Sequence, residues 1–153
     1  MSIFQSNFDE IDRHSDPTSQ RYGILLNWQD LPNPVWHYGI GLSDRYIYDP
    51  VGRCVFEKKH AKLVLGIDSI AFAPAKTIER LKHALCVFAD WNYNITGWNC
   101  EHLSRLIATG QPRCYQSKPI WWLCNLTPDG DHKIARLVFE NYLGQRNPEL
   151  NFR

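Results

Sequence analysis

The sequence predicts an α+β fold in which a small antiparallel sheet packs on helices. Residues 36–42 alternate apolar side chains with histidine and glycine, which is the period of a strand with one packed face. Two later segments, residues 77–91 and 100–109, repeat apolar residues at helical spacing. A chain of 153 residues can bury about 70% of its unfolded surface, enough for one core but not for two domains.

The N-terminal part of the chain contains a tail and a first strand. Residues 1–20 are polar, carry charges of both signs and lack an apolar run, so we expect a flexible arm and no secretory signal. Residues 21–28 are the first expected strand, and residues 29–34 are a proline-rich turn. Residues 54–56 and 62–67 are expected to form further short strands, one of which should complete an antiparallel sheet.

His37 lies in an expected hairpin, on the face of its strand that points away from the apolar neighbours. Ser43 and Asp44 favour a turn, and residues 45–49 form the return strand. If the loop is centred on Ser43, Asp49 lies directly opposite His37. Side chains opposed in this way have Cβ atoms about 4.5–5.5 Å apart, so we expect the carboxylate to hold the imidazole in one tautomer.

Two amphipathic helices are expected to supply core residues. In the sequence, one precedes and the other follows the central helix. Thr77 is the expected N-cap of the first, and its apolar residues from Ile78 to Phe88 form a core stripe. The last helix begins at Asp131 and ends at Gly144.

The central helix begins with the segment Asn99-Cys100-Glu101-His102. Asn99 fits the N-cap position, and Gly110 is a natural stop after the last turn. Glu101 and Arg105 are four residues apart in the favourable order, which predicts a solvent-side ion pair. A cysteine at a helix N-terminus faces backbone N–H groups and the positive end of the helix dipole, so the sequence predicts a thiolate at Cys100.

These residues suggest nucleophilic catalysis. Cys100 would attack a carbonyl carbon, His37 would accept the thiol proton and later protonate the leaving group, and Asp49 would orient His37. Backbone N–H groups at the start of the helix would stabilise the oxyanion. The expected reaction is acyl transfer through a thioester.

Each of these residues also has a structural interpretation. An isolated cysteine at the front of an amphipathic helix is usually a small buried hydrophobe. Asp49 precedes Pro50, and Asp-Pro commonly starts a turn. His102 lies about 200° around the helix from Cys100 at 3.6 residues per turn, so we interpret it as a structural hydrogen-bonding residue.

The order of these features resembles that of the lecithin:retinol acyltransferase (LRAT) family, also called the NC domain family. In that order, a strand with a histidine is followed by a turn, a polar residue and then Asn-Cys-Glu-His on a helix. The resemblance covers roughly residues 20–117 and implies a circularly permuted papain-like fold, with residues 21–117 as the catalytic core. It implies that His37 and Cys100 are the catalytic pair and that Asn99 supports them. The third polar residue of the family, usually a histidine, maps to Asp49. The family chemistry needs no metal and no organic cofactor.

Composition limits the partners of the chain. The net charge is +1 and no basic block is present, which argues against nucleic acid and against strong electrostatic attraction to membranes. The five cysteines are an odd number without a Cys-x-x-Cys motif, so neither a complete disulfide framework nor a zinc site is indicated. We therefore expect a cytoplasmic protein that acts on a small-molecule or lipid acyl substrate.

Residues 118–153 are expected to pack on the core as an aromatic segment followed by the last helix. Residues 118–123 are strongly apolar but far shorter than the roughly 20 residues that a membrane-spanning helix needs. They could make a weak contact with a membrane surface, or they could cover the core or close an acyl pocket. The oligomeric state stays open.

Three function classes remain. The first is a thiol acyltransferase or esterase of the LRAT type, acting on a lipid or another acyl ester. The second uses the same nucleophile to cleave an amide, as a peptidase or amidase. The third is a non-catalytic interaction module with the same fold.

Overall fold

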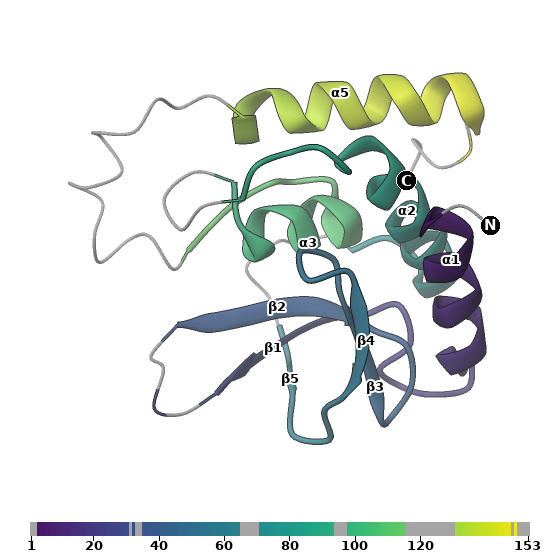
Figure 1. Cartoon of the computed structure of the whole chain (residues 1–153), viewed down its shortest axis with the longest axis vertical. Helices are drawn as coiled ribbons and strands as arrows, with labels where there is room; N and C mark the ends of the chain where they lie inside the picture. Colours follow the sequence, from purple (N-terminus) through teal and green to yellow (C-terminus); the bar gives the residue numbers. More distant parts are fainter. Residues whose placement is uncertain are drawn as a thin grey trace.

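The computed structural model describes residues 3–30, 32, 35–64, 71–93, 98–115, 131–147 and 149. These residues form four helices and one five-stranded antiparallel sheet, so the predicted α+β class is confirmed. Figure 1 shows the sheet on one side of the molecule, α2 and α3 beside it, and α5 on the far side of these helices.

The sheet has the order β4-β3-β2-β1-β5. Its strands are β1 (Leu25–Gln29), β2 (Trp36–Gly41), β3 (Tyr46–Asp49), β4 (Cys54–Glu57) and β5 (Lys62–Leu63). Each strand lies close to where the sequence predicts one, and each pairs antiparallel with its neighbours. β2, which carries His37, is therefore the central strand.

Three helices pack against one another and the sheet: α2 (Pro74–Val87), α3 (Cys100–Thr109) and α5 (Asp131–Arg146). α3 lies against β2, and α2 contacts both α3 and α5. α2 begins at Pro74 rather than after Thr77, because proline fits the first helical turn, where its missing N–H is not needed. α5 contributes Ala135, Phe139 and Leu143 to the core, and it continues past the expected stop at Gly144 to Arg146. The aromatic segment 118–123 lies outside the described residues.

The predicted flexible arm is wrong for most of residues 1–20, because Ile3–His14 form helix α1. Ile11 is fully buried, and Asp12 pairs with Lys82 of α2 at 2.7 Å. The sequence carries the signal for this helix in Phe4, Phe8 and Ile11, which follow helical spacing in an otherwise polar segment. Ile11 belongs to the main core and Phe8 packs against it, and these contacts hold the helix in place.

Each face of the sheet contributes side chains to a different apolar cluster. Tyr38 and Ile40 of β2 belong to the main core, together with the apolar side of α3. Leu26, Trp28 and Ile47 form a smaller cluster on the other face. His37 is paired with Trp28 across the β1–β2 ladder, so its side chain shares the face of the smaller cluster.

The predicted hairpin register is wrong by two residues. Ile40 pairs with Tyr48 and Gly41 with Ile47, and the backbone N–H of Leu42 donates to Tyr46 at 2.9 Å. The loop is therefore centred on Asp44 rather than Ser43. The Ser43 hydroxyl explains the shift in register. It accepts a hydrogen bond from the Tyr46 N–H at 3.1 Å, and this bond fits a longer turn.

Asp49 is consequently not opposite His37. It pairs with Cys54 of β4, and in the shifted register it lies beyond the last residue of β2 that pairs with β3. The Asp49 carboxylate accepts from the Val51 N–H at 2.9 Å and so fixes the β3–β4 turn. The turn interpretation of this residue is confirmed.

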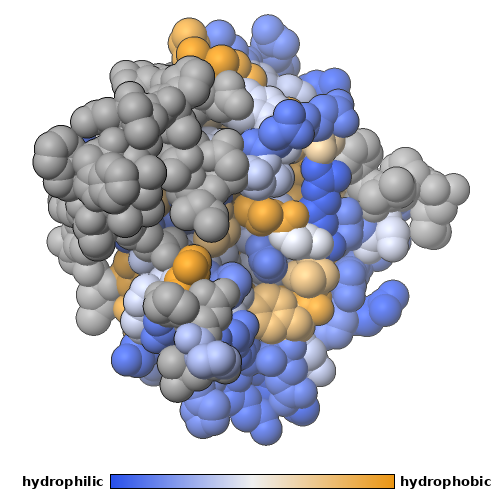
Figure 2. All heavy atoms as spheres, turned by 60° about the vertical axis from the view of Figure 1, so that its left-hand side comes forward, coloured by the Kyte–Doolittle hydropathy of each residue, from blue (hydrophilic) through white to orange (hydrophobic). Residues whose placement is uncertain are grey.

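The exposed large apolar side chains of the described residues include three on one stretch of α5. On the face in Figure 2, apolar side chains lie in small areas between hydrophilic ones. The exposed large apolar side chains are Val35, Leu63, Ile134, Leu137 and Val138. Among the described residues, no helix has both the length and the apolar character needed to cross a membrane.

Candidate active site

The start of α3 is fixed by Asn99, as predicted. Its side-chain oxygen accepts hydrogen bonds from the backbone N–H groups of Glu101 at 3.0 Å and His102 at 3.2 Å. The His102 ring returns the interaction, because its Nδ1 accepts from the Asn99 N–H at 3.4 Å. This reciprocal capping box confirms the structural interpretation of His102. Gly110 ends the helix with a left-handed φ of 75°.

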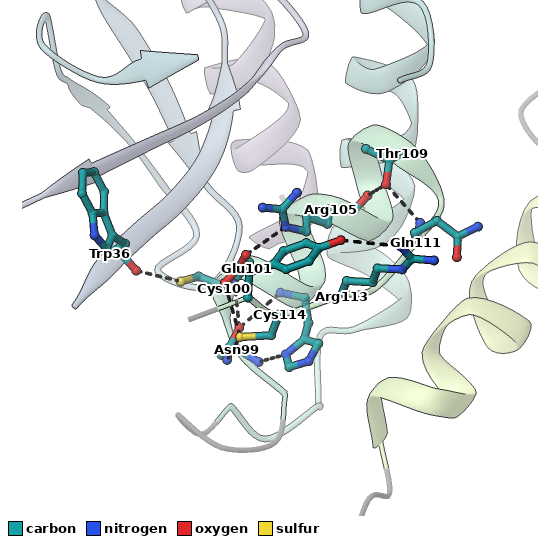
Figure 3. Close-up of polar contacts among 11 residues, drawn as sticks. Trp36, Asn99, Cys100, Glu101, Arg105, Thr109, Gln111, Arg113 and Cys114 are labelled. Carbon is teal, nitrogen blue, oxygen red and sulfur yellow. Dashed lines mark hydrogen bonds and ion pairs between the residues drawn. The ribbon is translucent and has the colours of Figure 1, made fainter. Parts of the chain in front are cut away.

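Cys100 is the first residue of α3, and its sulfur lies at the backbone of β2. The Sγ atom is 4.0 Å from the Trp36 carbonyl oxygen, to which the thiol donates (Figure 3). The Tyr38 N–H in turn hydrogen-bonds the sulfur. Trp36 and Tyr38 are the two neighbours of His37. The sulfur of the candidate nucleophile therefore lies against the backbone on either side of the candidate base.

This part of the β2 edge is open to the thiol because the β3 ladder ends early. The N–H and C=O groups of Trp36 and Tyr38 point toward the β3 side of the strand, as those of Ile40 do. Continuing the ladder would place Pro50 opposite Tyr38, and proline has no N–H to donate. The turn at Asp49 also leads the chain away toward β4. Cys100 thus occupies hydrogen-bonding positions that a longer β3 would have filled.

The Cys100 thiol is protonated at neutral pH in this conformation. Burial raises its pKa to about 11, and the charges of Asp49, Glu101 and Cys114 act in the same direction. The Tyr38 N–H lowers the pKa but only partly offsets burial. The predicted thiolate is therefore wrong for the resting structure, because desolvation outweighs the favourable position at the helix N-terminus.

The His37 imidazole lies on the other face of the sheet from α3. Its ring stacks on Trp28, with 5.7 Å between ring centroids and an interplanar angle of 17°. Its Nε2 atom is 4.0 Å from the Asp30 carboxylate, which also pairs with Lys58. The hydrogen bond from Lys58 lowers the pKa of Asp30, so this residue is a carboxylate at neutral pH. The side chain of His37 is 36% exposed, which leaves room for it to change rotamer.

The predicted catalytic set is therefore assembled only in part. Cys100 and Asn99 lie where they are expected, and His37 is beside them in the strand but points to the opposite face. Asp49 is near enough for its charge to raise the pKa of Cys100, although it does not pair with His37. The sequence reading missed Asp30, which follows the first strand directly and is exposed.

Glu101 and Arg105 form a buried ion pair rather than the expected solvent-side one. Their Oε1 and Nε atoms are 2.9 Å apart, and the side chains are 0% and 2% exposed. The guanidinium also lies over the Tyr38 ring, 5.5 Å from its centroid. The pair is buried because this side of α3 packs on β2 and on the chain that follows the helix.

Cys114 was not expected at the site. Its sulfur accepts a hydrogen bond from the Asn99 amide at 3.3 Å and donates one to Glu101 Oε2 at 3.3 Å (Figure 3). It belongs to residues 111–114, which form neither helix nor strand. Only the folded chain brings this thiol to the first turn of α3.

No family model, curated protein or solved structure matches the chain. Within the described residues, no group of three or more histidine, cysteine or acidic side chains could hold a metal ion.

Proposed function

We propose that the chain is a cysteine-dependent acyltransferase or hydrolase of the LRAT type, with a circularly permuted papain-like arrangement. One observation carries this proposal. The Cys100 sulfur, at the first residue of a capped helix, contacts the backbone of Trp36 and Tyr38, the two neighbours of His37. A nucleophile and its base need such proximity, with the helix N-terminus supplying N–H donors.

The proposed reaction requires the His37 side chain to rotate around the open edge of β2 toward the sulfur. The rotation gives up the stack on Trp28 and the contact with Asp30. The imidazole then accepts the thiol proton, and the imidazolium lowers the pKa of Cys100 from the high value of the resting state. Substrate binding would favour this rotamer if the acyl group displaces His37 from Trp28.

In the chemical step, the Cys100 thiolate attacks the carbonyl carbon of the acyl donor. The N–H groups of Glu101 and His102 already donate to Asn99, which leaves the Cys100 N–H to stabilise the oxyanion. Collapse of the tetrahedral intermediate forms the thioester, and the leaving group takes its proton from His37. Water or another acceptor, deprotonated by His37, then releases the acyl group.

Two carboxylates have separate roles in this proposal. Asp30 holds His37 in the resting rotamer, because it contacts Nε2 on the Trp28 face. Asp49 orients His37 in the reacting rotamer, because its charge acts on the Cys100 side of β2. Asp30→Asn and Asp49→Asn are therefore matched variants with opposite expected effects on activity.

The proposed substrate is a lipid or another acyl ester, with no metal or organic cofactor. The proposed setting is the cytoplasm, where reducing conditions keep Cys100 as a thiol. A weak contact with a membrane surface fits the same proposal.

A second candidate is a non-catalytic interaction module, which two observations favour. The imidazole points away from the sulfur, and burial raises the pKa of Cys100 to about 11. In such a module Cys100 has the role of a packed side chain that satisfies the open edge of β2.

Intact-mass measurement of acyl-protein formation distinguishes the two candidates. Wild-type protein is incubated at pH 7.5 with a p-nitrophenyl acyl ester or with phosphatidylcholine vesicles. The acyltransferase proposal predicts an acyl adduct on Cys100 that is absent in Cys100→Ala. It also predicts release that is slower in His37→Ala by roughly 10²–10⁴-fold. An adduct from a peptide substrate, with release of an amine, would favour an amidase.

The matched Asp variants test the role of His37. Asp49→Asn is expected to slow acylation, and Asp30→Asn is expected to increase its rate. Ester turnover that is equal in wild type, Cys100→Ala and His37→Ala would leave the interaction module as the better account.

A further inference from the structure

Cys114 lies in a site with a proton acceptor and a hydrogen-bond donor. The thiol donates to Glu101 Oε2 at 3.3 Å, while the Asn99 amide donates to the sulfur at 3.3 Å. The other carboxylate oxygen of Glu101 accepts from Arg105 Nε at 2.9 Å. The thiol hydrogen of Cys114 therefore points at a carboxylate oxygen, and the Asn99 N–H is placed to stabilise negative charge on the sulfur.

Asn99 joins this second thiol to the first. Its oxygen caps the helix that begins with Cys100, and its nitrogen contacts Cys114. Both sulfur atoms lie at the first turn of α3, as Figure 3 shows. The charge of Cys114 also acts on Cys100, which agrees with their proximity.

We propose that Cys114 is a resolving thiol for Cys100, so that a hydroperoxide converts the pair to an intramolecular disulfide. In the first step Cys100 reacts through its minor thiolate form: the sulfur attacks the peroxide and the O–O bond breaks. Cys100 becomes a sulfenic acid, and the departing oxygen takes up the proton that the thiol released and leaves as water or alcohol. In the second step Cys114 gives its proton to Glu101 and attacks the sulfenic sulfur. The S–S bond forms, the S–O bond breaks, and hydroxide leaves and is protonated to water.

The chain around the two thiols permits this step. Cys100 is fixed by the helix and by β2, whereas residues 111–114 form neither helix nor strand and can carry Cys114 toward it. Cys54 lies on β4, where its Cα is paired with that of Asp49, and Cys86 lies on α2. The contacts of Asn99 thus select Cys114 among the described thiols.

The disulfide would block the proposed acyl transfer, because it consumes Cys100. It is nevertheless a separate property, since it needs only two thiols and a hydroperoxide. A protein without acyltransferase activity could still form it.

The test is peptide mapping of the full chain after treatment with hydrogen peroxide, with free thiols alkylated before digestion. The expected product is a linked peptide containing Cys100 and Cys114, with a loss of two hydrogen atoms that a thiol reductant restores. Cys114→Ser keeps a donor to Glu101 but cannot form the link, so a sulfenic acid should accumulate on Cys100 and react with dimedone. Cys54→Ser is the matched control and should behave as wild type.

Three results would overturn the proposal: oxidation of Cys100 to sulfinic acid in the wild type without linkage, a link to another cysteine such as Cys124, or unchanged linkage in Cys114→Ser. Acyl-adduct formation under reducing conditions is measured on the same variants. Cys114→Ser is expected to form the adduct as wild type does, so loss of the disulfide and loss of acyl transfer are distinguishable.

Discussion

The His37 imidazole stacks on Trp28 with 5.7 Å between ring centroids, on the face of the sheet that α3 does not cover. The Cys100 thiol is therefore without imidazole in the resting structure, and its pKa is about 11. The proposed acyl transfer therefore depends on how often His37 leaves Trp28.

The alkylation of Cys100 should report this resting state directly. The reactive species is the thiolate, so the rate with iodoacetamide should rise tenfold per pH unit and level off only near pH 11. At pH 8 we expect Cys100 in the folded protein to react roughly a hundredfold more slowly than an ordinary unfolded thiol. Rates are measured by peptide mapping of timed samples, with urea-unfolded protein as the reference.

His37→Ala is the control, and it should leave this profile unchanged. A plateau in the wild type below pH 8 that disappears in His37→Ala would contradict the expectation. Such a plateau would mean that the imidazole already lies on the thiol in solution.

The cap at Asn99 should contribute measurably to stability. Asn99→Ala removes the oxygen that accepts from Glu101 and His102, and a lost cap of this kind costs about 0.5–2 kcal/mol. Asn99→Asp retains an acceptor and should recover most of this loss. Urea unfolding followed by circular dichroism measures both, and equal destabilisation by Ala and Asp would show that the cap is unimportant.

The local features of the site could be predicted from sequence, and the features that depend on distant parts of the chain could not. Asn99, Cys100 and Gly110 were identified correctly because capping depends on a few neighbouring residues. The hairpin was also identified, but its register depends on one hydroxyl, that of Ser43. A shift of two residues preserves the pattern of inward and outward side chains, so periodicity cannot detect it.

Burial explains the other differences. Glu101 and Arg105 have the spacing of a surface pair, and only the packing of α3 against β2 makes them a buried one. The pKa of Cys100 follows the same rule, since the helix position is visible in the sequence and the desolvation is not. Cys114 joins the site through a loop whose course no local pattern specifies.

The buried pair predicts a strong asymmetry between single and double variants. Glu101→Ala leaves the Arg105 guanidinium without its carboxylate, and breaking a buried pair in this way costs about 3–5 kcal/mol. The double variant Glu101→Leu with Arg105→Met replaces both charges by apolar groups and should be close to the wild type in stability. Chemical denaturation of the wild type, Glu101→Leu, Arg105→Met and the double variant gives the coupling energy, and additive losses would contradict the prediction.

The N-terminal helix should be an integral part of the fold. Ile11→Ala removes a fully buried side chain, for which the expected loss is about 2–5 kcal/mol. Gln5→Ala changes an exposed position on the same helix and should change stability by less than about 0.5 kcal/mol. Thermal unfolding compares the two, and equal midpoints would indicate that α1 does not contribute to the core.

His83 should make stability depend on pH between neutral and mildly acidic conditions. It packs between α2 and α5 with its ring 5.7 Å from that of Tyr142, and burial lowers its pKa below 6.5. Arg146 and Lys82 lower the pKa further, while Glu79 raises it. Below pH 6.5 the unfolded chain therefore binds a proton that the folded one does not, so stability falls as the pH decreases from 6.5 toward the folded pKa.

His83→Gln cannot take up this proton, so its stability should decrease less over the same interval. Urea titrations of both proteins from pH 7.5 to pH 5 measure the difference in slope, which cancels the contributions of the other histidines. Parallel curves would mean that His83 titrates equally in the folded and unfolded chains, and the α2–α5 contact would then be more open to solvent than the structure has it.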